Sequence, residues 1–323
     1  MGWTGRLLCL LGARFPDTEL ERRYRKFRIT HYFLRDDGFQ AAVRASGICA
    51  LGVSGLVRSG PTAGTAVIFV MIIAPAVQLA MRSLADRRGR TEAALASYLR
   101  QRCAWAAVAR TLLCPLVVCT YFLEFFRHSP GSPTTLFRLG AYALYSTGAI
   151  VLFGTCLSYP VLLEHHLAIQ PLSVLMLAYW RGGPFCREAL ADDSGPEHML
   201  AAWRALEAGS RQVLAAMYMG EVPAGPEPDP LPACLHVALA LHVCVGLAAA
   251  TYVAWLAEHA SRVHFLTASW RVERMGWEPL GGWAILSQLV MGAGCLAVAW
   301  PALGMLVLDP GGWDGGEAAC DAT

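Results

Sequence analysis

Residues 21–35, ERRYRKFRITHYFLR, precede the first long apolar run of the chain and decide the direction of everything that follows. Their basic side chains are Arg22, Arg23, Arg25, Lys26, Arg28 and Arg35. Basic residues within about 15–20 residues of a membrane span hold their segment on the cytoplasmic side. This stretch therefore predicts a cytoplasmic amino terminus.

The composition excludes an ordinary soluble domain. Of the 323 residues, 55% are hydrophobic and only 15% are charged, whereas soluble domains carry about 25% charged residues. The formal net charge is only +2, and the basic residues gather at the ends of apolar runs instead of along one face. This pattern predicts an integral membrane protein whose surroundings are the lipid bilayer, and it predicts no nucleic-acid partner.

Six apolar runs approach the length of about 20 residues that a helical span requires. They cover residues 40–57, 62–81, 104–126, 139–163, 231–257 and 282–308. The sequence therefore predicts an all-α fold, a polytopic six-helix transmembrane bundle with both termini cytoplasmic. Its parts are a basic amino-terminal segment (1–39), helices 1–4 (40–163), a cytoplasmic loop (164–230), helices 5–6 (231–308) and an acidic tail (309–323).

The distribution of basic residues supports this orientation. In the six-span arrangement 19 Lys or Arg residues lie inside and six lie outside, the bias expected of cytoplasmic loops. The linker 82–102 is rich in arginine, and Thr91 followed by Glu92 predicts a helix start. Residues 258–281 mix arginines with aromatic side chains, which favours a place along the outer surface.

The segment 167–180 leaves one alternative open. It is apolar but only fourteen residues long and contains Pro171, so it is interpreted as interfacial or re-entrant. As a seventh span it would reverse every later segment and place Cys186 and Cys320 outside. In the six-span arrangement no cysteine is placed to form an extracellular disulfide.

The long loop carries a predicted helix at residues 194–220. Ser194 and Glu197 have the spacing of a capping box. Apolar side chains recur at helical intervals at Met199, Leu200, Trp203, Leu206, Val213, Leu214 and Met217. This pattern predicts an amphipathic cytoplasmic helix that packs against protein through Trp203, followed by a proline-rich acidic linker.

Polar residues inside apolar runs are the candidate functional residues. Arg110 and Glu124 lie in the third run, about 21 Å apart along a helix, too far to pair with each other. Each is expected to reach headgroups at its own interface, with an intramembrane functional site as the alternative. Gln78 and Gln288 are the polar candidates in other spans.

No catalytic, cofactor-binding or metal-binding residue is predicted. The sequence contains no Walker, GxSxG, HExxH or post-strand GxGxxG motif. His166, His236 and His242 do not supply two histidine pairs at matching depth for haem. The neighbours Glu164, His165 and His166 point apart on a helix and cannot share a metal. Gly154 and Ser158, four residues apart, predict close contact between helices.

The motif Phe15-x-Asp17-x-x-Leu20-Glu21-x-x-Tyr24 before a multi-span block resembles the amino-terminal membrane regions of protist and algal class III adenylate and guanylate cyclases. The resemblance covers residues 15–46. In that family the membrane block feeds a cytoplasmic catalytic domain, and no such domain follows the sixth run here. Cyclase activity and its metal ligands are therefore not assigned to any position.

Two functions remain as hypotheses. The first is a non-enzymatic sensory or scaffolding membrane module whose cytoplasmic face binds a protein partner or a second copy of the chain. The residues predicted to face that partner are Arg22, Arg23, Arg25, Lys26 and Trp203. The second is a small-solute transporter or channel that uses Arg110 with Gln78 and Gln288. A cavity within the span region lined by Arg110 would favour the second hypothesis.

Overall fold

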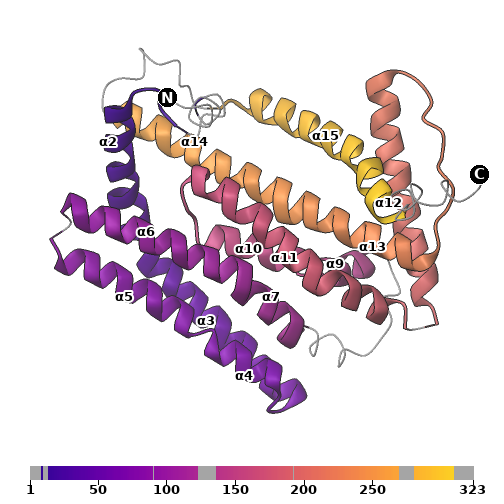
Figure 1. The fold of residues 1–323 in the computed structure, drawn as a ribbon, viewed down its shortest axis with the longest axis horizontal. Coiled ribbons are helices and arrows are strands. Elements are labelled where there is room, and N and C mark those ends of the chain that lie inside the picture. The colour runs from indigo at the N-terminus through magenta and orange to yellow at the C-terminus, as the bar shows by residue number, and fades with distance from the viewer. Residues whose placement is uncertain are drawn as a thin grey trace, which may run out of the picture. The chain divides into compact units, whose positions relative to one another are not determined.

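The computed structural model describes residues 9, 14–89, 91–122, 136–191, 193–268 and 280–308, and the regular elements among them are all helical (Figure 1). Five helices are long and apolar enough to cross a membrane, which makes this an α-helical protein of integral-membrane character. They are Thr18–Ser59, Ala63–Arg87, Glu92–Tyr121, Pro230–Ala268 and Gly282–Val307. Glu124 and the acidic tail 309–323 lie outside the described residues.

The chain forms two compact units, which are described separately. The first contains residues 1–130, 148–177 and 245–279, and the second contains residues 131–147, 178–244 and 280–323. Two of the boundaries fall inside long helical stretches. One lies in α11 (Leu163–Ala189), and the other lies in the continuous stretch of α13 (Pro230–Leu241), η4 (His242–Ala249) and α14 (Ala250–Ala268). Residues 167–180 thus belong to a 27-residue helix and are not a short separate segment.

The first unit begins with the basic stretch as a helix. Asp17 accepts hydrogen bonds from the backbone N–H groups of Glu19 and Leu20 and so caps α2 (Thr18–Arg28). α2 continues through the π-helical turn η1 (Ile29–Phe33) into α3 (Leu34–Ser59). The basic segment and the first expected span are therefore one continuous helix.

The next two expected spans are also present. α4 (Ala63–Val70) and α5 (Ile73–Arg87) form one stretch that is interrupted at Met71 and Ile72, shortly before Pro75. Because proline lacks an N–H group, a break near it is expected. The third begins at Thr91, whose hydroxyl caps α6 (Glu92–Val108), and continues as η2 (Ala109–Leu113), α7 (Cys114–Val117) and η3 (Val118–Phe122).

The fourth expected span, 139–163, is not one helix. α9 (Leu136–Ser146) belongs to the second unit, and α10 (Ala149–Ser158) belongs to the first. Gly148 separates them with φ 79°, a left-handed conformation that interrupts an α-helix. A Cβ atom at Gly148 would also lie 2.7 Å from a methyl carbon of Val118, so no larger side chain fits there.

α2 packs against the end of α14 within the first unit (Figure 1). Phe15, Tyr24 and Phe265 form an aromatic cluster. Beside it, Arg262 Nη1 donates to Glu21 Oε2 at 2.8 Å. The expectation that residues 258–281 lie along the outer surface, across a bilayer from the amino-terminal segment, is wrong for residues 258–268, because two segments on opposite sides of a membrane of about 30 Å cannot touch.

The second unit contains α9, α12 (Gly195–Tyr218), α13 and α15 (Gly282–Leu308). α12 occupies the predicted helix position, and it contacts α9, α13 and α15. The Ser194 side chain makes no capping hydrogen bond, so the predicted capping box does not form. Met199, Trp203 and Leu214 are buried, whereas Leu206 and Met217 on the predicted apolar face are exposed.

A disulfide links Cys186 near the end of α11 to Cys234 in the first turns of α13, with their Cα atoms 5.7 Å apart. The six-span arrangement predicts that Cys186 lies in the cytoplasm, and it predicts no extracellular disulfide. The sequence does not predict this pairing, because no local pattern shows that the ends of α11 and α13 meet.

Candidate solute-binding cavity

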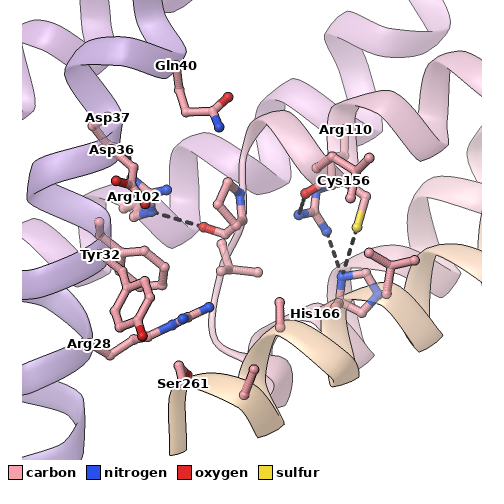
Figure 2. Close-up of a pocket in the computed structure, with 18 residues that line it drawn as sticks. Arg28, Tyr32, Asp36, Asp37, Gln40, Arg102, Arg110, Cys156, His166 and Ser261 are labelled. Atoms are coloured by element: carbon pink, nitrogen blue, oxygen red, sulfur yellow. Dashed lines mark hydrogen bonds and ion pairs between the residues drawn. The ribbon is translucent and has the colours of Figure 1, made fainter. Parts of the chain in front are cut away.

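A cavity of about 380 Å³ lies within the first unit, between the basic amino-terminal helix and α6, α10, α11 and α14. Figure 2 shows Arg28, Tyr32, Asp36, Asp37 and Arg102 on one side of it and Arg110, Cys156 and His166 on the other. Ligand pockets in proteins commonly have volumes of about 300–1,000 Å³. The cavity is therefore large enough for a small solute.

On one side of the cavity the charges are paired. Asp37 and Arg102 form a buried ion pair, and the Tyr98 hydroxyl also donates to Asp37. Arg102 Nε donates to the Pro160 carbonyl at 3.0 Å, which ties α6 to the segment after α10. Arg28 is held by the face of Tyr32, 4.7 Å from the ring centroid. This side presents little uncompensated charge.

Arg110 on the other side is different. It has no exposed surface, and it donates to His166 Nδ1 at 3.0 Å and to Gln170 Oε1 at 3.1 Å. Its other terminal nitrogen donates to the carbonyls of Cys156 and Tyr159 at 3.2 and 2.7 Å. The expectation that Arg110 reaches the headgroups is therefore wrong.

The partners of Arg110 are all neutral or dipolar. The carbonyls of Cys156 and Tyr159 are at the carboxyl end of α10, where a helix carries roughly half a negative charge. No carboxylate in the described part of the chain lies within ion-pair distance of this guanidinium. Its buried Nε also has no acceptor. A full positive charge at the cavity wall is therefore only partly compensated.

Arg110 also fixes the protonation of His166. Because a guanidinium only donates, His166 Nδ1 must be the acceptor, and the Nε2–H group must donate to Thr251 Oγ1 at 3.1 Å. The Cys156 sulfur lies 3.7 Å from the same Nδ1. His166 is thus a neutral side chain that positions the arginine. Among the described residues, no three His, Cys, Asp or Glu side chains gather as metal ligands.

The other polar candidates are divided between the two units. Gln78 is buried in the first unit, where its side-chain oxygen accepts from Arg44, but it does not line the cavity with Arg110. Gln288 is half-buried on α15 of the second unit. Of the predicted intramembrane residues that the structure describes, Arg110 alone lines this cavity.

The predicted partner-facing residues also differ in environment. Arg22, Arg23 and Lys26 are exposed. Arg25 binds Glu164 at 2.9 Å and Glu21 at 3.1 Å. Trp203 is buried in the second unit, with 5% of its surface exposed. Arg25 and Trp203 therefore make internal contacts, whereas Arg22, Arg23 and Lys26 on the outer face of α2 remain open to a partner.

Sequence reasoning missed Asp37 and Arg102, which line the cavity as an ion pair. Both lie just outside the apolar runs, where charged residues are expected to be solvated. Their signal is weak, because one acidic and one basic residue at span ends are common. Comparison of the chain with protein-family models, curated proteins and solved structures found no match.

Proposed function

We propose that this protein is a small-solute transporter or channel that accepts an anion at Arg110. The observation that carries the proposal is a fully buried guanidinium, in a cavity of about 380 Å³, to which no carboxylate of the described residues is paired. Charged residues within membrane spans face a bundle interior or a water-filled cavity and commonly mark ion pathways. An anionic solute would supply the missing charge.

The hydrogen-bond geometry supports an anion over a neutral solute. His166, Gln170 and two carbonyls engage the terminal nitrogens, and they leave the net charge of Arg110 in place. Removing a charge from water costs several kcal/mol, which a nearby opposite charge offsets. The Asp37–Arg102 pair contributes no net charge to the cavity, whereas Arg110 has no carboxylate partner among the described residues.

The test is anion flux in liposomes that contain the purified protein, with chloride, nitrate, phosphate and acetate as probes. Arg110→Gln should lower the initial rate by roughly tenfold or more, because it removes the positive charge that offsets the cost of taking the anion out of water. Arg110→Lys keeps the charge but loses the planar donors, so it should change the order of preference among the anions. Size-exclusion profiles confirm that each variant is folded.

Arg22→Gln is the matched control, because Arg22 is an exposed arginine of the same unit. It should leave the flux unchanged. If the unaltered protein moves none of the four anions, or if Arg110→Gln and Arg22→Gln behave alike, the proposal fails. The sensory or scaffolding function, supported by the exposed Arg22, Arg23 and Lys26, then takes its place.

We also propose a seven-span topology in which α11 crosses the membrane. α2 contacts the start of α6 through Arg22 and Glu92 at 2.7 Å, and the start of α11 through Arg25 and Glu164 at 2.9 Å. It also contacts the end of α14. In this topology the starts of α6 and α11 and the end of α14 lie on the cytoplasmic side with the basic segment. Residues 258–281 are then cytoplasmic, whereas the six-span arrangement places them outside.

The disulfide supports the same arrangement. A 27-residue helix is about 40 Å long, enough to cross a bilayer. If α11 begins inside at Glu164, Cys186 near its end lies outside, as does Cys234 in the first turns of the stretch that returns as α14. Disulfides persist in oxidising compartments. The loop with the amphipathic helix α12 then faces outward, and so does the carboxyl terminus.

The charge distribution permits this change. Relative to six spans, Arg262, Arg271 and Arg274 move inside, whereas the basic residues of 181–211 move outside. The cytoplasmic excess persists, because the basic residues of 1–44 and 82–102 are unaffected. Charge bias alone therefore does not separate the two topologies, and the contacts of α2 favour seven spans.

Labelling of intact cells with a membrane-impermeant maleimide tests the topology. Gly225→Cys, in the linker after α12, should be labelled without permeabilisation. Gly89→Cys, in the arginine-rich linker, should be labelled only after permeabilisation. The unaltered protein gives the background from its own cysteines. Labelling of Gly225→Cys only in permeabilised cells would restore the cytoplasmic loop of the six-span arrangement.

A further inference from the structure

A second cavity of about 370 Å³ lies in the first unit and is lined by residues of α3, α4, α5, α7, α10 and η2. Its wall is mainly apolar, with Leu51, Leu113 and Val151 among the lining side chains. Polar groups gather around Arg44 and Tyr159. The cavity thus joins a polar site to an apolar chamber.

Arg44 is the charged group of this cavity. Its guanidinium donates to the Ser158 carbonyl and to Gln78 Oε1, and it lies 4.1 Å from the ring centroid of Tyr159. Its buried Nε has no acceptor. Within the described ranges, no carboxylate forms an ion pair with Arg44, so its positive charge lacks a counter-charge.

Two glycines show that the chamber lacks protein atoms. A Cβ atom built at Gly47 on α3 or at Gly154 on α10 would meet no heavy atom within 4 Å. Both residues line the cavity. The predicted close helix contact at Gly154 is therefore wrong. In place of a neighbouring helix, this glycine faces open space.

The cavity can be reached from the side of the helix bundle. Val43 and Leu51, which line it on α3, have 51% and 39% of their surfaces exposed. Both lie in a stretch that is long and apolar enough to cross a membrane. A molecule dissolved in the bilayer could therefore enter sideways.

We propose that this cavity binds a lipid with a single hydrocarbon chain and an anionic head, of the long-chain carboxylate class. The carboxylate pairs with Arg44, and the chain passes Gly47 and Gly154 into the apolar chamber. Within a bilayer, lipid tails are as apolar as the chamber wall, so burial of the chain gives little preference. The charge pair at Arg44 must therefore supply the selectivity.

The site is separate from the anion cavity at Arg110, because Arg110 does not line it. The two proposals therefore fail independently. A protein that moves anions but does not bind the lipid would refute only the lipid site. A protein that binds the lipid but moves no anion would refute only the transport function.

The experiment is photo-crosslinking of the delipidated full-length protein in a non-ionic detergent with a diazirine-bearing palmitate. Labelled peptides should come from α3 and α10. Excess palmitate should compete, whereas methyl palmitate, which has the same chain without the charge, should not. Competition by phosphatidylglycerol as effective as that by palmitate would show that a two-chain lipid fits and would overturn the single-chain assignment.

Two variants test the two halves of the site. Arg44→Gln should lower crosslinking by roughly tenfold, because a charged hydrogen bond is lost. Gly154→Leu should block the chamber while keeping the helix, because leucine favours a helix over glycine. Gly292→Leu on α15 of the second unit is the control, since a Cβ there also meets nothing within 4 Å. Equal crosslinking in Gly154→Leu and Gly292→Leu would refute the proposed site.

Discussion

Replacing Arg262 by methionine is expected to destabilise the protein by about 3–5 kcal/mol, the usual cost of removing one partner from a buried ion pair. Arg262 has 1% of its side chain exposed, and it lies between Glu21 at 2.8 Å and Glu258 at 3.0 Å. Without it, two buried carboxylates would face each other without their shared cation. The melting temperature of the detergent-solubilised protein measures the effect.

Arg22→Met is the control for this change. Arg22 forms ion pairs with Glu19 and Glu92, but its side chain is 60% exposed. Exposed pairs of this kind contribute about 0–1 kcal/mol. Combining Arg262→Met with Glu21→Gln should cost less than the sum of the two single changes, because the two residues share one interaction. If the two single losses of stability add up to the loss in the double variant, the interaction between Arg262 and Glu21 does not stabilise the protein.

The surroundings of Arg262 show which features of the fold can be predicted from the sequence and which cannot. The apolar runs predicted most helices well, and the run 282–308 matches α15 at both ends, because length and hydropathy are local properties. The side of the membrane on which residues 258–268 lie depends on how many spans precede them. The proposed seventh span, α11, is not apparent in the sequence, because Gln170, Pro171 and Arg181 interrupt its apolar pattern.

The reason α11 tolerates these polar residues appears only in three dimensions. Gln170 donates to the Gly246 carbonyl at 2.6 Å and accepts from Arg110. Arg181 binds the Ser146 carbonyl at 2.7 Å and Glu188 at 2.9 Å. Polar groups that are satisfied within the protein do not face lipid, so their cost is reduced. An average hydropathy over a window of sequence treats each of these polar side chains as if it faced lipid.

The candidate site was predictable in part. Arg110 stands out in the sequence as a charge within a long apolar run. Its partners come from α10 and α11, about 45–60 positions later, and no local pattern joins them. The interruption at Gly148 was equally hidden, because a glycine within an apolar helix is common. The disulfide between Cys186 and Cys234 required knowing that α11 and α13 meet.

Replacing Trp203 by alanine is the second change expected to have a large effect, a loss of about 3–5 kcal/mol. In the second unit Trp203 packs with Ala233, Val237, Ala240 and Trp300. Its indole N–H also donates to His236 Nδ1 at 3.1 Å. The substitution would therefore leave a cavity and remove the hydrogen-bond donor of a buried histidine.

Trp203→Phe separates the two contributions. Phenylalanine keeps most of the packing but cannot donate to His236, whose Nε2–H group is already directed to the Trp300 carbonyl at 3.0 Å. The unsatisfied Nδ1 should cost about 1–3 kcal/mol. Leu206→Ala is the control on the same helix, because Leu206 is 41% exposed and its truncation removes few contacts.

The melting temperature of the solubilised protein should thus fall most for Trp203→Ala, less for Trp203→Phe and least for Leu206→Ala. This order follows because Trp203 contributes both a large buried side chain and a hydrogen bond to the contact of α12 with α13 and α15, whereas Leu206 is partly exposed. If the Trp203→Ala and Leu206→Ala proteins had the same melting temperature, α12 would not be docked on α13 and α15 in solution. The apolar face of α12 would then be free to bind a partner.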